Sequence, residues 1–287
     1  MDALAPPCAG QRTVRVLENR RIARDTYLMR LDDPEMAATI RPGQFLMVRP
    51  ETGSDPLLGR PFAVYDVTWD ECGTPVAVEI VYLVLGAGTA ALARQRHGDR
   101  VRIWGPLGNG FGAPPGGDVV FVAGGIGQTP FLALGRWWLG AASYAGESFA
   151  DASRCSSATL LYGARDASYL AGLDDFRAAG IHVEVATDNG TAGHHGYVTD
   201  LLTSRLERGG RPSHVVGCGP VPMLKALTKI VTSEGISCDL SLENHMACGF
   251  GACFSCVTPI RQEDGTSDLR RVCVEGPIFD AKDVVFS

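Results

Sequence analysis

Apolar and polar residues alternate along residues 12–112, and turn-forming residues interrupt the alternation at short intervals. Side chains of a β-strand point alternately to its two faces, so this pattern predicts strands that are buried on one side. Glycine, proline and aspartate separate these segments, which favours antiparallel neighbours that close into a barrel. The expected strands lie near residues 14–16, 27–31, 45–48, 76–84 and 101–103.

The pattern then changes, and continuous apolar runs alternate with segments of helical periodicity. This alternation predicts an open parallel sheet covered by helices. Buried strands are expected at residues 119–123, 159–162, 183–186 and 214–216, and helices at residues 131–139, 197–206 and 223–233. The last segment is too short for an independent ferredoxin fold and is expected to form a small lobe. The fold class is therefore multidomain β plus α/β: an antiparallel β-barrel, a parallel α/β domain and a small C-terminal lobe.

The composition is that of an ordinary globular protein of 287 residues, 45% of them hydrophobic and 20% charged. A formal net charge of -6 and the lack of a basic run argue against a nucleic-acid partner. The most apolar window is broken by a glutamate and by glycines, so no membrane-spanning helix is expected. Residues 1–7 lack the features of a secretory signal and are expected to form a disordered tail.

Some of the nine cysteines are scattered along the chain without the spacing of a disulfide framework. This usage predicts a reducing compartment, and hence a cytoplasmic location. The scattered cysteines are Cys8, Cys72, Cys155, Cys218 and Cys238.

Four further cysteines near the C-terminus follow the pattern C-x4-C-x2-C-x16-C, which is the plant-type ligand spacing of a [2Fe-2S] cluster. They are Cys248, Cys253, Cys256 and Cys273. The glycines between them let the backbone turn and bring N–H groups close to the sulfurs. A structural zinc site is the alternative, but zinc thiolates usually come in two short C-x2-C-like pairs. The spacing therefore predicts an iron-sulfur cluster and transfer of single electrons.

A glycine-rich turn formed by Gly124, Gly125, Gly127 and Thr129 follows the expected strand at residues 119–123. Backbone N–H groups at a helix N-terminus bind pyrophosphate, and Thr129 with the following proline has the features of an N-cap and first helical residue. The turn lacks the third glycine and the acidic ribose ligand of a dinucleotide fingerprint. A tight turn without a ligand is therefore the alternative.

Cys218 lies at the end of another expected strand, at the edge where open α/β sheets bind ligands. Its thiol is expected either to contact a nicotinamide or to be buried as a small apolar group, and the sequence leaves both open. The choice between NAD and NADP is also open. Arg165 suits a 2′-phosphate, whereas the adjacent Asp166 would repel one.

The order of the motifs resembles the electron transfer subunit of class 1B dihydroorotate dehydrogenase over nearly the whole chain. These motifs are R-P-x-x, Y-x-x-x-G-x-G-T, G-P-L-G-N-G-F, G-G-I-G-Q-T-P, C-G-P and the four spaced cysteines. That family belongs to the ferredoxin-reductase-like flavoproteins. The resemblance implies an FAD-binding barrel at residues 12–114, an NAD-binding α/β domain at residues 115–234 and a [2Fe-2S] lobe at residues 235–287.

The resemblance also assigns three flavin-binding segments, which spacing alone does not distinguish from structural turns. They are Arg60, Pro61, Phe62 and Ala63; Val81, Tyr82 and Leu83; and Gly88 with Thr89. Ala63 and Leu83 depart from the family, which commonly has a hydroxyl residue and a basic residue at these positions. Backbone donors at both places are still able to serve.

No acid and base pair, nucleophile motif or histidine cluster is evident, so the chemistry on an organic substrate is expected on a partner. The resemblance implies an FMN-containing dihydroorotate dehydrogenase catalytic subunit, joined in a hetero-oligomer that serves pyrimidine biosynthesis. Phe250, Phe254 and Phe279 are candidates for the interface. A nicotinamide exchanges two electrons as hydride and a [2Fe-2S] cluster carries one, so a flavin is expected between them.

Two other functions fit the sequence. One is the electron transfer subunit of a hydrogenase, a sulfide dehydrogenase or an NAD(P)-linked transhydrogenase, which has the same layout. The other is a redox-sensing or zinc-stabilised regulatory protein that has kept the fold and lost turnover, as the departures at Ala63 and Leu83 suggest.

Overall fold

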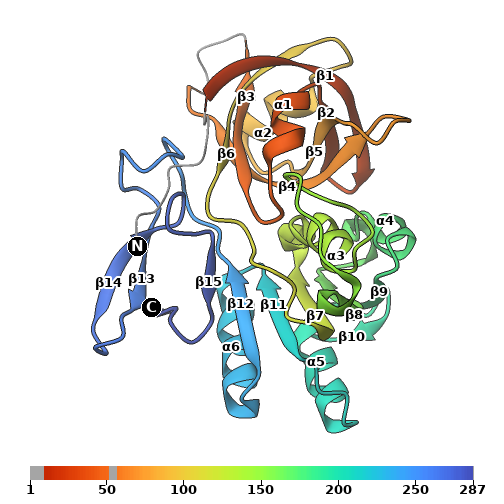
Figure 1. Ribbon diagram of the computed structural model, residues 1–287, viewed down its shortest axis with the longest axis vertical. Helices are drawn as coiled ribbons and strands as arrows, with labels where there is room; N and C mark the ends of the chain where they lie inside the picture. Colours follow the sequence, from red (N-terminus) through yellow and green to blue (C-terminus); the bar gives the residue numbers. More distant parts are fainter. Residues whose placement is uncertain (1–9, 52–56, 287) are drawn as a thin grey trace.

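The computed structural model describes residues 10–51 and 57–286. The expected N-terminal tail and Cys8 lie outside the described residues. Figure 1 shows a barrel above an α/β sheet, with a lobe of two short strands beside them. No helix in the described ranges is long and apolar enough to cross a membrane.

The antiparallel barrel is confirmed, because its strands close in the order β1-β2-β5-β4-β3-β6. Its elements are β1 (Gly10–Ala23), β2 (Thr26–Leu31), α1 (Pro34–Thr39), β3 (Phe45–Pro50), β4 (Arg60–Trp69), β5 (Pro75–Leu83), α2 (Ala87–Ala93) and β6 (Arg100–Leu107). The alternation did not predict β4, which starts with Arg60 and Pro61. Its pairing of Val64 with Ile80 places the start of β4 and the end of β5 at the same end of the barrel.

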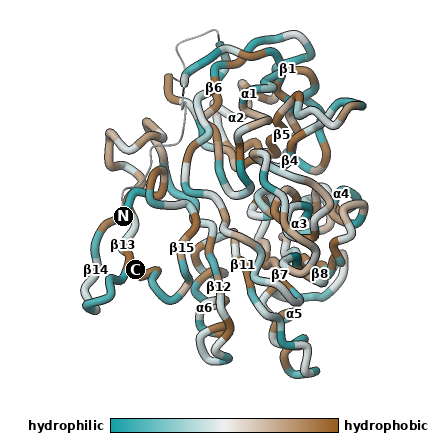
Figure 2. The backbone as a smooth tube through the Cα atoms, viewed as in Figure 1, coloured by the Kyte–Doolittle hydropathy of each residue, from teal (hydrophilic) through white to brown (hydrophobic). Residues whose placement is uncertain are grey.

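The parallel sheet is also confirmed, in the order β10-β9-β8-β7-β11-β12-β15. Its strands are β7 (Gly117–Gly124), β8 (Cys155–Ala164), β9 (His182–Thr187), β10 (His194–His195), β11 (His214–Cys218), β12 (Ser237–Ser241) and β15 (Ile278–Asp280). The strand order reverses direction between β7 and β11, so the carboxyl ends of these strands flank a switch point. In Figure 2, hydrophobic segments run through the central strands, which supply much of the buried core.

Helices and short 3-10 turns connect these strands. They are η1 (Gly125–Gln128), α3 (Phe131–Trp138), η2 (Asp151–Ser153), η3 (Ala167–Tyr169), α4 (Leu173–Ala178), α5 (Val198–Glu207) and α6 (Val221–Glu234). The prediction of Thr129 as an N-cap is wrong. A 3-10 turn over Gly125–Gln128 intervenes, and Pro130 takes the N-cap position of α3 without a side-chain hydrogen bond.

The C-terminal lobe contains the antiparallel pair β13 (Val257–Arg261) and β14 (Ser267–Arg271). Two strands of the segment expected to form the lobe lie in the large sheet instead: β12 pairs in parallel with β11, and β15 pairs antiparallel with β12. The sheet therefore continues past the expected domain limit at residue 235. The limits themselves stay predictions.

Buried polar contacts fasten the barrel to the α/β domain through β4. The carboxylate of Asp66 accepts a hydrogen bond from the Tyr144 hydroxyl at 2.6 Å and forms an ion pair with Arg136 of α3. The Tyr65 hydroxyl donates to Asp175 of α4 at 2.8 Å. Burial raises the pKa of Asp66, and Arg136 and Tyr144 offset part of that shift. A buried carboxylate thus relies on partners from the other domain.

Replacement of Tyr144 by phenylalanine is expected to lower the free energy of unfolding by about 1 to 3 kcal/mol, because the buried Asp66 loses a hydrogen bond. Urea unfolding followed by tryptophan fluorescence measures the change. Tyr197→Phe is the control, since the Tyr197 side chain is exposed. An equal midpoint for Tyr144→Phe and the control would contradict this role of the contact.

Candidate functional site

A cavity of about 770 Å³ opens between the barrel and the carboxyl ends of the sheet strands. The barrel contributes Thr26 and Leu83 to its lining, and the sheet contributes residues that follow β7, β8 and β11. Two of the expected phosphate-binding residues, Gly124 and Gly125, lie in this lining. The cavity therefore occupies the switch point, which is where open α/β sheets bind ligands, and its volume is typical of a cofactor site.

Gly127, Thr129 and Cys218 lie behind the cavity wall. A Cβ on Gly127 would lie 2.3 Å from the carbonyl oxygen of Cys218, so only glycine fits there. Thr129 and Cys218 are buried. Burial raises the pKa of the Cys218 thiol well above its ordinary value, and the charge of Glu243 adds to the shift. Cys218 thus has the features of a buried neutral thiol, and its contact with a nicotinamide stays a prediction.

The cavity lining is more acidic than basic. Its charged side chains are Asp25, Arg165, Asp188 and Glu243. The guanidinium of Arg165 lies 5.8 Å from the ring centre of Tyr169. The neighbouring carboxylate of Asp166 accepts hydrogen bonds from the Ser168 hydroxyl and from the Ser168 N–H, the latter at 2.8 Å, and these bonds lower its pKa. Arg165 is therefore placed to meet a nucleotide, whereas Asp166 is occupied by its own turn.

The sequence patterns missed Glu243, which follows β12 by two residues at the same edge of the sheet. Recognising residues 237–241 as a strand would have placed it there. Its side chain is accessible through the cavity, but the surrounding protein is dense enough that burial raises its pKa. Glu243 is thus a cavity carboxyl that holds its proton more tightly than an exposed glutamate does.

The expected flavin segments gather at one end of the barrel, at the start of β4, the end of β5 and the first turn of α2. Tyr82 is buried, and its hydroxyl donates to Asn19 at 2.9 Å, so this side chain belongs to the barrel interior. Leu83 instead faces the cavity. The Thr89 hydroxyl accepts a hydrogen bond from the N–H of Leu85 at 2.9 Å, which shapes the turn between β5 and α2.

The start of β4 also faces the lobe. Pro61 pairs with Met47 and Ala63 pairs with Phe45, and side chains of directly paired residues point to the same face. Met47 and Phe45 pack in one buried group with two of the cluster cysteines, Cys256 and Cys273, rather than in the barrel core. The expected flavin segment and the expected cluster loop therefore share one wall of the barrel.

The four C-terminal cysteines converge as two pairs. Cys253 is in hydrogen-bond contact with Cys248, and Cys273 with Cys256. Hydrogen bonding with Ser255, and then with Cys248, lowers the pKa of the exposed Cys253 thiol to about 6. Over the described part of the chain, no three His, Cys, Asp or Glu side chains are arranged to hold a single metal ion. Two thiol pairs are the donor set that a [2Fe-2S] cluster requires, so these residues fit that group.

The cluster loop is held in shape by glycines and by an arginine. Gly249 and Gly251 have φ of +80° and +90°, a region that favours glycine. Arg271 donates a hydrogen bond to the Gly251 carbonyl at 3.3 Å and pairs with Glu275 at 2.8 Å. Its guanidinium lies 5.1 Å from the ring centre of Phe254. Arg271 thus ties the ligand loop to the turn that carries Cys273.

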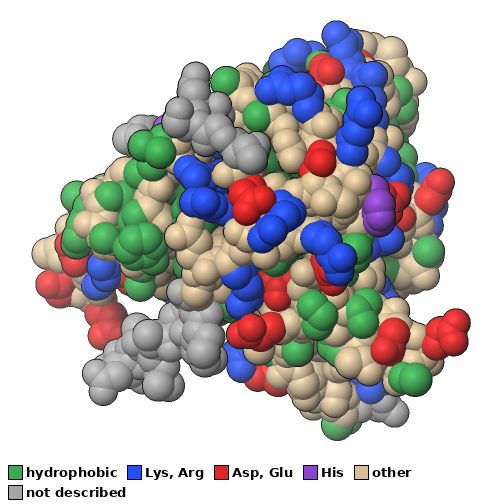
Figure 3. All heavy atoms as spheres, turned by 90° about the horizontal axis from the view of Figure 1, so that it is seen from above, with side chains coloured by type: hydrophobic (Ala, Val, Ile, Leu, Met, Phe, Trp, Pro, Cys, Tyr) green, Lys and Arg blue, Asp and Glu red, His purple; other side chains and the backbone are tan. Residues whose placement is uncertain are grey.

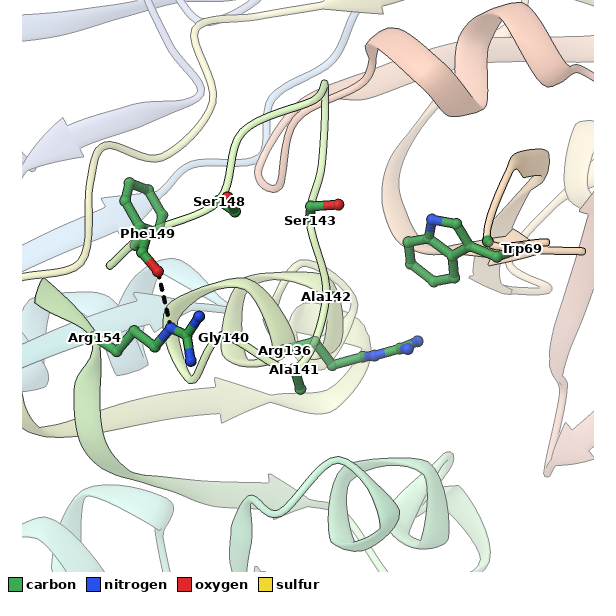
Figure 4. Close-up of a pocket in the computed structure, with 10 residues that line it drawn as sticks. Trp69, Arg136, Gly140, Ala141, Ala142, Ser143, Ser148, Phe149 and Arg154 are labelled. Carbon is green, nitrogen blue, oxygen red and sulfur yellow. Dashed lines mark hydrogen bonds between the residues drawn. The ribbon is translucent and has the colours of Figure 1, made fainter. Parts of the chain in front are cut away.

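A second cavity, of about 360 Å³, lies at the other end of β4, between Trp69 and the loop that follows α3. Figure 4 shows the guanidinium of Arg136 pointing toward Trp69 and that of Arg154 bonded to the Phe149 carbonyl. Arg136 is already paired with Asp66. None of the expected site residues lies in this lining, so the larger cavity is the better candidate site.

Comparison with known proteins agrees with this geometry. Residues 243–285 match a family model described as the iron-sulfur cluster binding domain of dihydroorotate dehydrogenase B. A solved structure of an NADH-dependent reduced ferredoxin-NADP oxidoreductase superposes with a TM-score of 0.77 at 26% identity, covering 97% of this chain and 91% of that chain. The fold is therefore that of the ferredoxin reductases.

Two relatives are each named dihydroorotate dehydrogenase B (NAD(+)), electron transfer subunit. The protein of Caldanaerobacter subterraneus subsp. tengcongensis is 36% identical over 272 residues, covering 95% of this chain and 97% of the relative. The protein of Desulforamulus reducens is 35% identical over 275 residues, with coverage of 95% and 97%. With this similarity over nearly its whole length, the chain belongs to the family of dihydroorotate dehydrogenase B electron transfer subunits.

Proposed function

We propose that this chain transfers electrons between NAD(H) and an FMN-containing dihydroorotate dehydrogenase catalytic subunit in pyrimidine biosynthesis. FAD and a [2Fe-2S] cluster supply the two-electron and one-electron chemistry when they are bound. The observation that carries the proposal is the position of the start of β4. It adjoins the nucleotide cavity through the neighbouring Leu83 end of β5, and it shares a wall with the cluster loop.

The proposal assigns each cofactor to residues that the fold brings together. Cys248, Cys253, Cys256 and Cys273 hold the cluster. The start of β4, the end of β5 and the first turn of α2 hold FAD, through Arg60, Pro61, Phe62, Ala63, Val81, Tyr82, Leu83, Gly88 and Thr89. Gly124, Gly125 and Gly127 receive the nucleotide phosphates, with Thr129 and Cys218 supporting them from behind. Tyr82, Thr129 and Cys218 are buried, so they act through packing and backbone position.

NAD rather than NADP is the proposed nucleotide. The named relatives are NAD(+)-linked. Among the described residues that line the cavity, Arg165 lies together with the acidic residues Asp25, Asp188 and Glu243. These carboxyl groups disfavour the additional dianionic phosphate of NADP.

The partner is proposed to dock on the cluster lobe. Phe250 and Phe254 are 60% and 61% exposed, and Leu269 of the adjacent hairpin is 60% exposed. Figure 3 shows hydrophobic side chains gathered on the side of the molecule that carries the lobe. Phe279 is half-buried and packs against Gly276, so it supports the lobe from within. Exposed aromatic side chains beside a redox centre favour a protein interface.

A cytoplasmic location is part of the proposal. Cys72, Cys155 and Cys238 are free thiols, and no disulfide is found among the cysteines that the structure describes. Free thiols of this kind persist in a reducing compartment.

Reconstitution with the catalytic subunit from the same genome tests the assignment. Dihydroorotate is expected to reduce NAD in the complex, and neither subunit alone is expected to support the reaction. A complex in which NADH reduces FAD but dihydroorotate reduces nothing would overturn the pyrimidine role. In that case the likeness to the ferredoxin-NADP oxidoreductase makes a transhydrogenase subunit the next candidate, tested by replacing the partner with ferredoxin and NADP. Colourless protein that contains zinc would instead support the regulatory alternative.

Cys253→Ser is expected to lose the cluster, because a [2Fe-2S] centre of this type needs all four thiolates. Iron and acid-labile sulfide should fall, while NADH still bleaches the flavin at a measurable rate. Cys72→Ser is the matched control, since Cys72 is an exposed thiol on the barrel. Retention of iron together with reduction of the partner would refute the ligand assignment.

Glu243→Gln is expected to stabilise the protein at alkaline pH. Below the ordinary pKa of 4.5, folded and unfolded chains both mostly hold the proton, so variant and wild type should melt nearly alike. As the pH rises, the unfolded chain releases the proton before the folded chain does, which lowers the free energy of unfolding of the wild type only.

Melting temperatures of the two proteins at about pH 4 and about pH 8 measure this difference. The variant should melt higher at the alkaline pH and equally at the acid pH. Glu263→Gln serves as the control, because Glu263 is exposed in the turn between β13 and β14. A melting difference that is the same at both pH values would show that burial does not shift this carboxyl.

A further inference from the structure

One side chain of the barrel is bonded directly to the cluster loop. The indole Nε1 of Trp104, in β6, donates a hydrogen bond to the carbonyl oxygen of Cys248 at 2.8 Å. Trp104 is half-buried and packs against the same buried group as Cys256 and Cys273. The first expected cluster ligand is therefore fixed to the barrel through its own backbone.

The same indole touches the segment that leads into β4. A Cβ built on Gly59 would lie 2.5 Å from Cη2 of Trp104, so the ring occupies the space that any larger residue at 59 would need. Gly59 directly precedes Arg60, the first residue of the proposed flavin-binding segment. One ring thus stands between that segment and a cluster ligand.

The strand register explains why these groups meet. Trp104 of β6 pairs with Met47 of β3, and Met47 pairs with Pro61 of β4. Adjacent strands are about 4.8 Å apart, so Trp104 and Pro61 lie on one row roughly 10 Å across. Directly paired side chains share a face, so this row faces the lobe.

The peptide after Cys248 is held against the same row. A Cβ on Gly249 would lie 2.6 Å from Cγ of Met47 and 3.2 Å from Cδ1 of Leu107. Gly249 is buried and has φ of +80°, so both its conformation and its packing require glycine. Close packing and the indole hydrogen bond therefore fix the same peptide from two directions.

We propose that Trp104 is a positioning residue that holds the Cys248 end of the cluster loop on the flavin-binding wall and so sets the separation between flavin and cluster. This inference rests on the proposed function. The step concerned is the passage of one electron from reduced FAD to the oxidised cluster, with no bond in the chain made or broken. A phenylalanine at 104 keeps the aromatic bulk but has no N–H to donate.

The test uses the holoprotein under anaerobic conditions, mixed rapidly with NADH. Absorbance follows the bleaching of flavin, and freeze-quenched EPR follows the reduction of the cluster. Trp104→Phe is expected to leave flavin bleaching and NADH-to-ferricyanide activity unchanged. Loss of a neutral hydrogen bond of about 1 kcal/mol shifts the equilibrium between the docked and undocked loop by about fivefold at 25 °C, so cluster reduction should slow by up to about that factor. The EPR line shape of the reduced cluster should also change, because the backbone of one ligand residue relaxes.

Trp137→Phe is the matched control. The indole of Trp137, in α3, also donates to a backbone carbonyl, that of Glu147 at 3.2 Å, but it lies in the α/β domain. This variant should reduce its cluster at the wild-type rate. Trp104→His keeps a ring N–H donor and is expected to recover part of the lost rate.

The outcomes distinguish a failure of the role of Trp104 from a failure of the proposed function. A wild-type protein whose cluster is not reduced by NADH would overturn the proposed function itself. A functional wild type with Trp104→Phe equal to it in rate and line shape would overturn only the role of Trp104. Equal defects in the phenylalanine and histidine variants would overturn the hydrogen bond as the cause. If Trp104→Phe fails to retain iron, retention by Trp104→His supports the proposal and loss in both overturns it.

Discussion

The packing of the cluster loop on the outer wall of the barrel is the contact on which the rest of this structure depends. Electrons pass between carriers only over short and fixed separations, so a loop that moved would be of little use. Three contacts prevent such movement: the Trp104 indole on the Cys248 carbonyl, Gly249 on Met47, and Asn109, whose side-chain amide donates to the carbonyl of Ile278 at 2.9 Å. Each joins a barrel strand or turn to the segment that surrounds the thiols.

Strand β4 fixes the barrel in the same way to its other neighbour, the α/β domain. It begins at the proposed flavin-binding segment and continues to Asp66, which is bonded to Arg136 and Tyr144 of the α/β domain. One strand therefore adjoins the lobe at its start and is anchored to the nucleotide-binding domain further along. The barrel therefore holds both the lobe and the α/β domain in place. This role explains why its junction with the α/β domain is buried and polar, since a flexible linker would have allowed the cavity to open.

Local signals in the sequence were enough to predict the barrel, the sheet, the position of the glycine turn and the group of four thiols. Each of these depends on the spacing of residues within one segment. Features that depend on pairing between distant segments were missed. Strand β4 begins with Arg60 and Pro61 and lacks a clean alternation, and Glu243 meets the cavity only because β12 lies beside β11. Trp104 had no distinguishing neighbours along the chain. The prediction of Thr129 as an N-cap was wrong because a 3-10 turn precedes α3. No residue pattern in the sequence predicted that turn.

The pairing of β15 with β12 has a consequence for how such a chain can be divided. One edge of β12, at Asp239, Leu240 and Ser241, is covered by β15. The residues of β15 all follow the four cysteines in the sequence. A reductase shortened before the family-matched segment would leave β12 as a bare edge, ready to join a second copy edge to edge. The iron-sulfur segment thus supplies the edge strand of the sheet as well as the expected cluster ligands. It is not a separable domain that could be deleted without exposing β12.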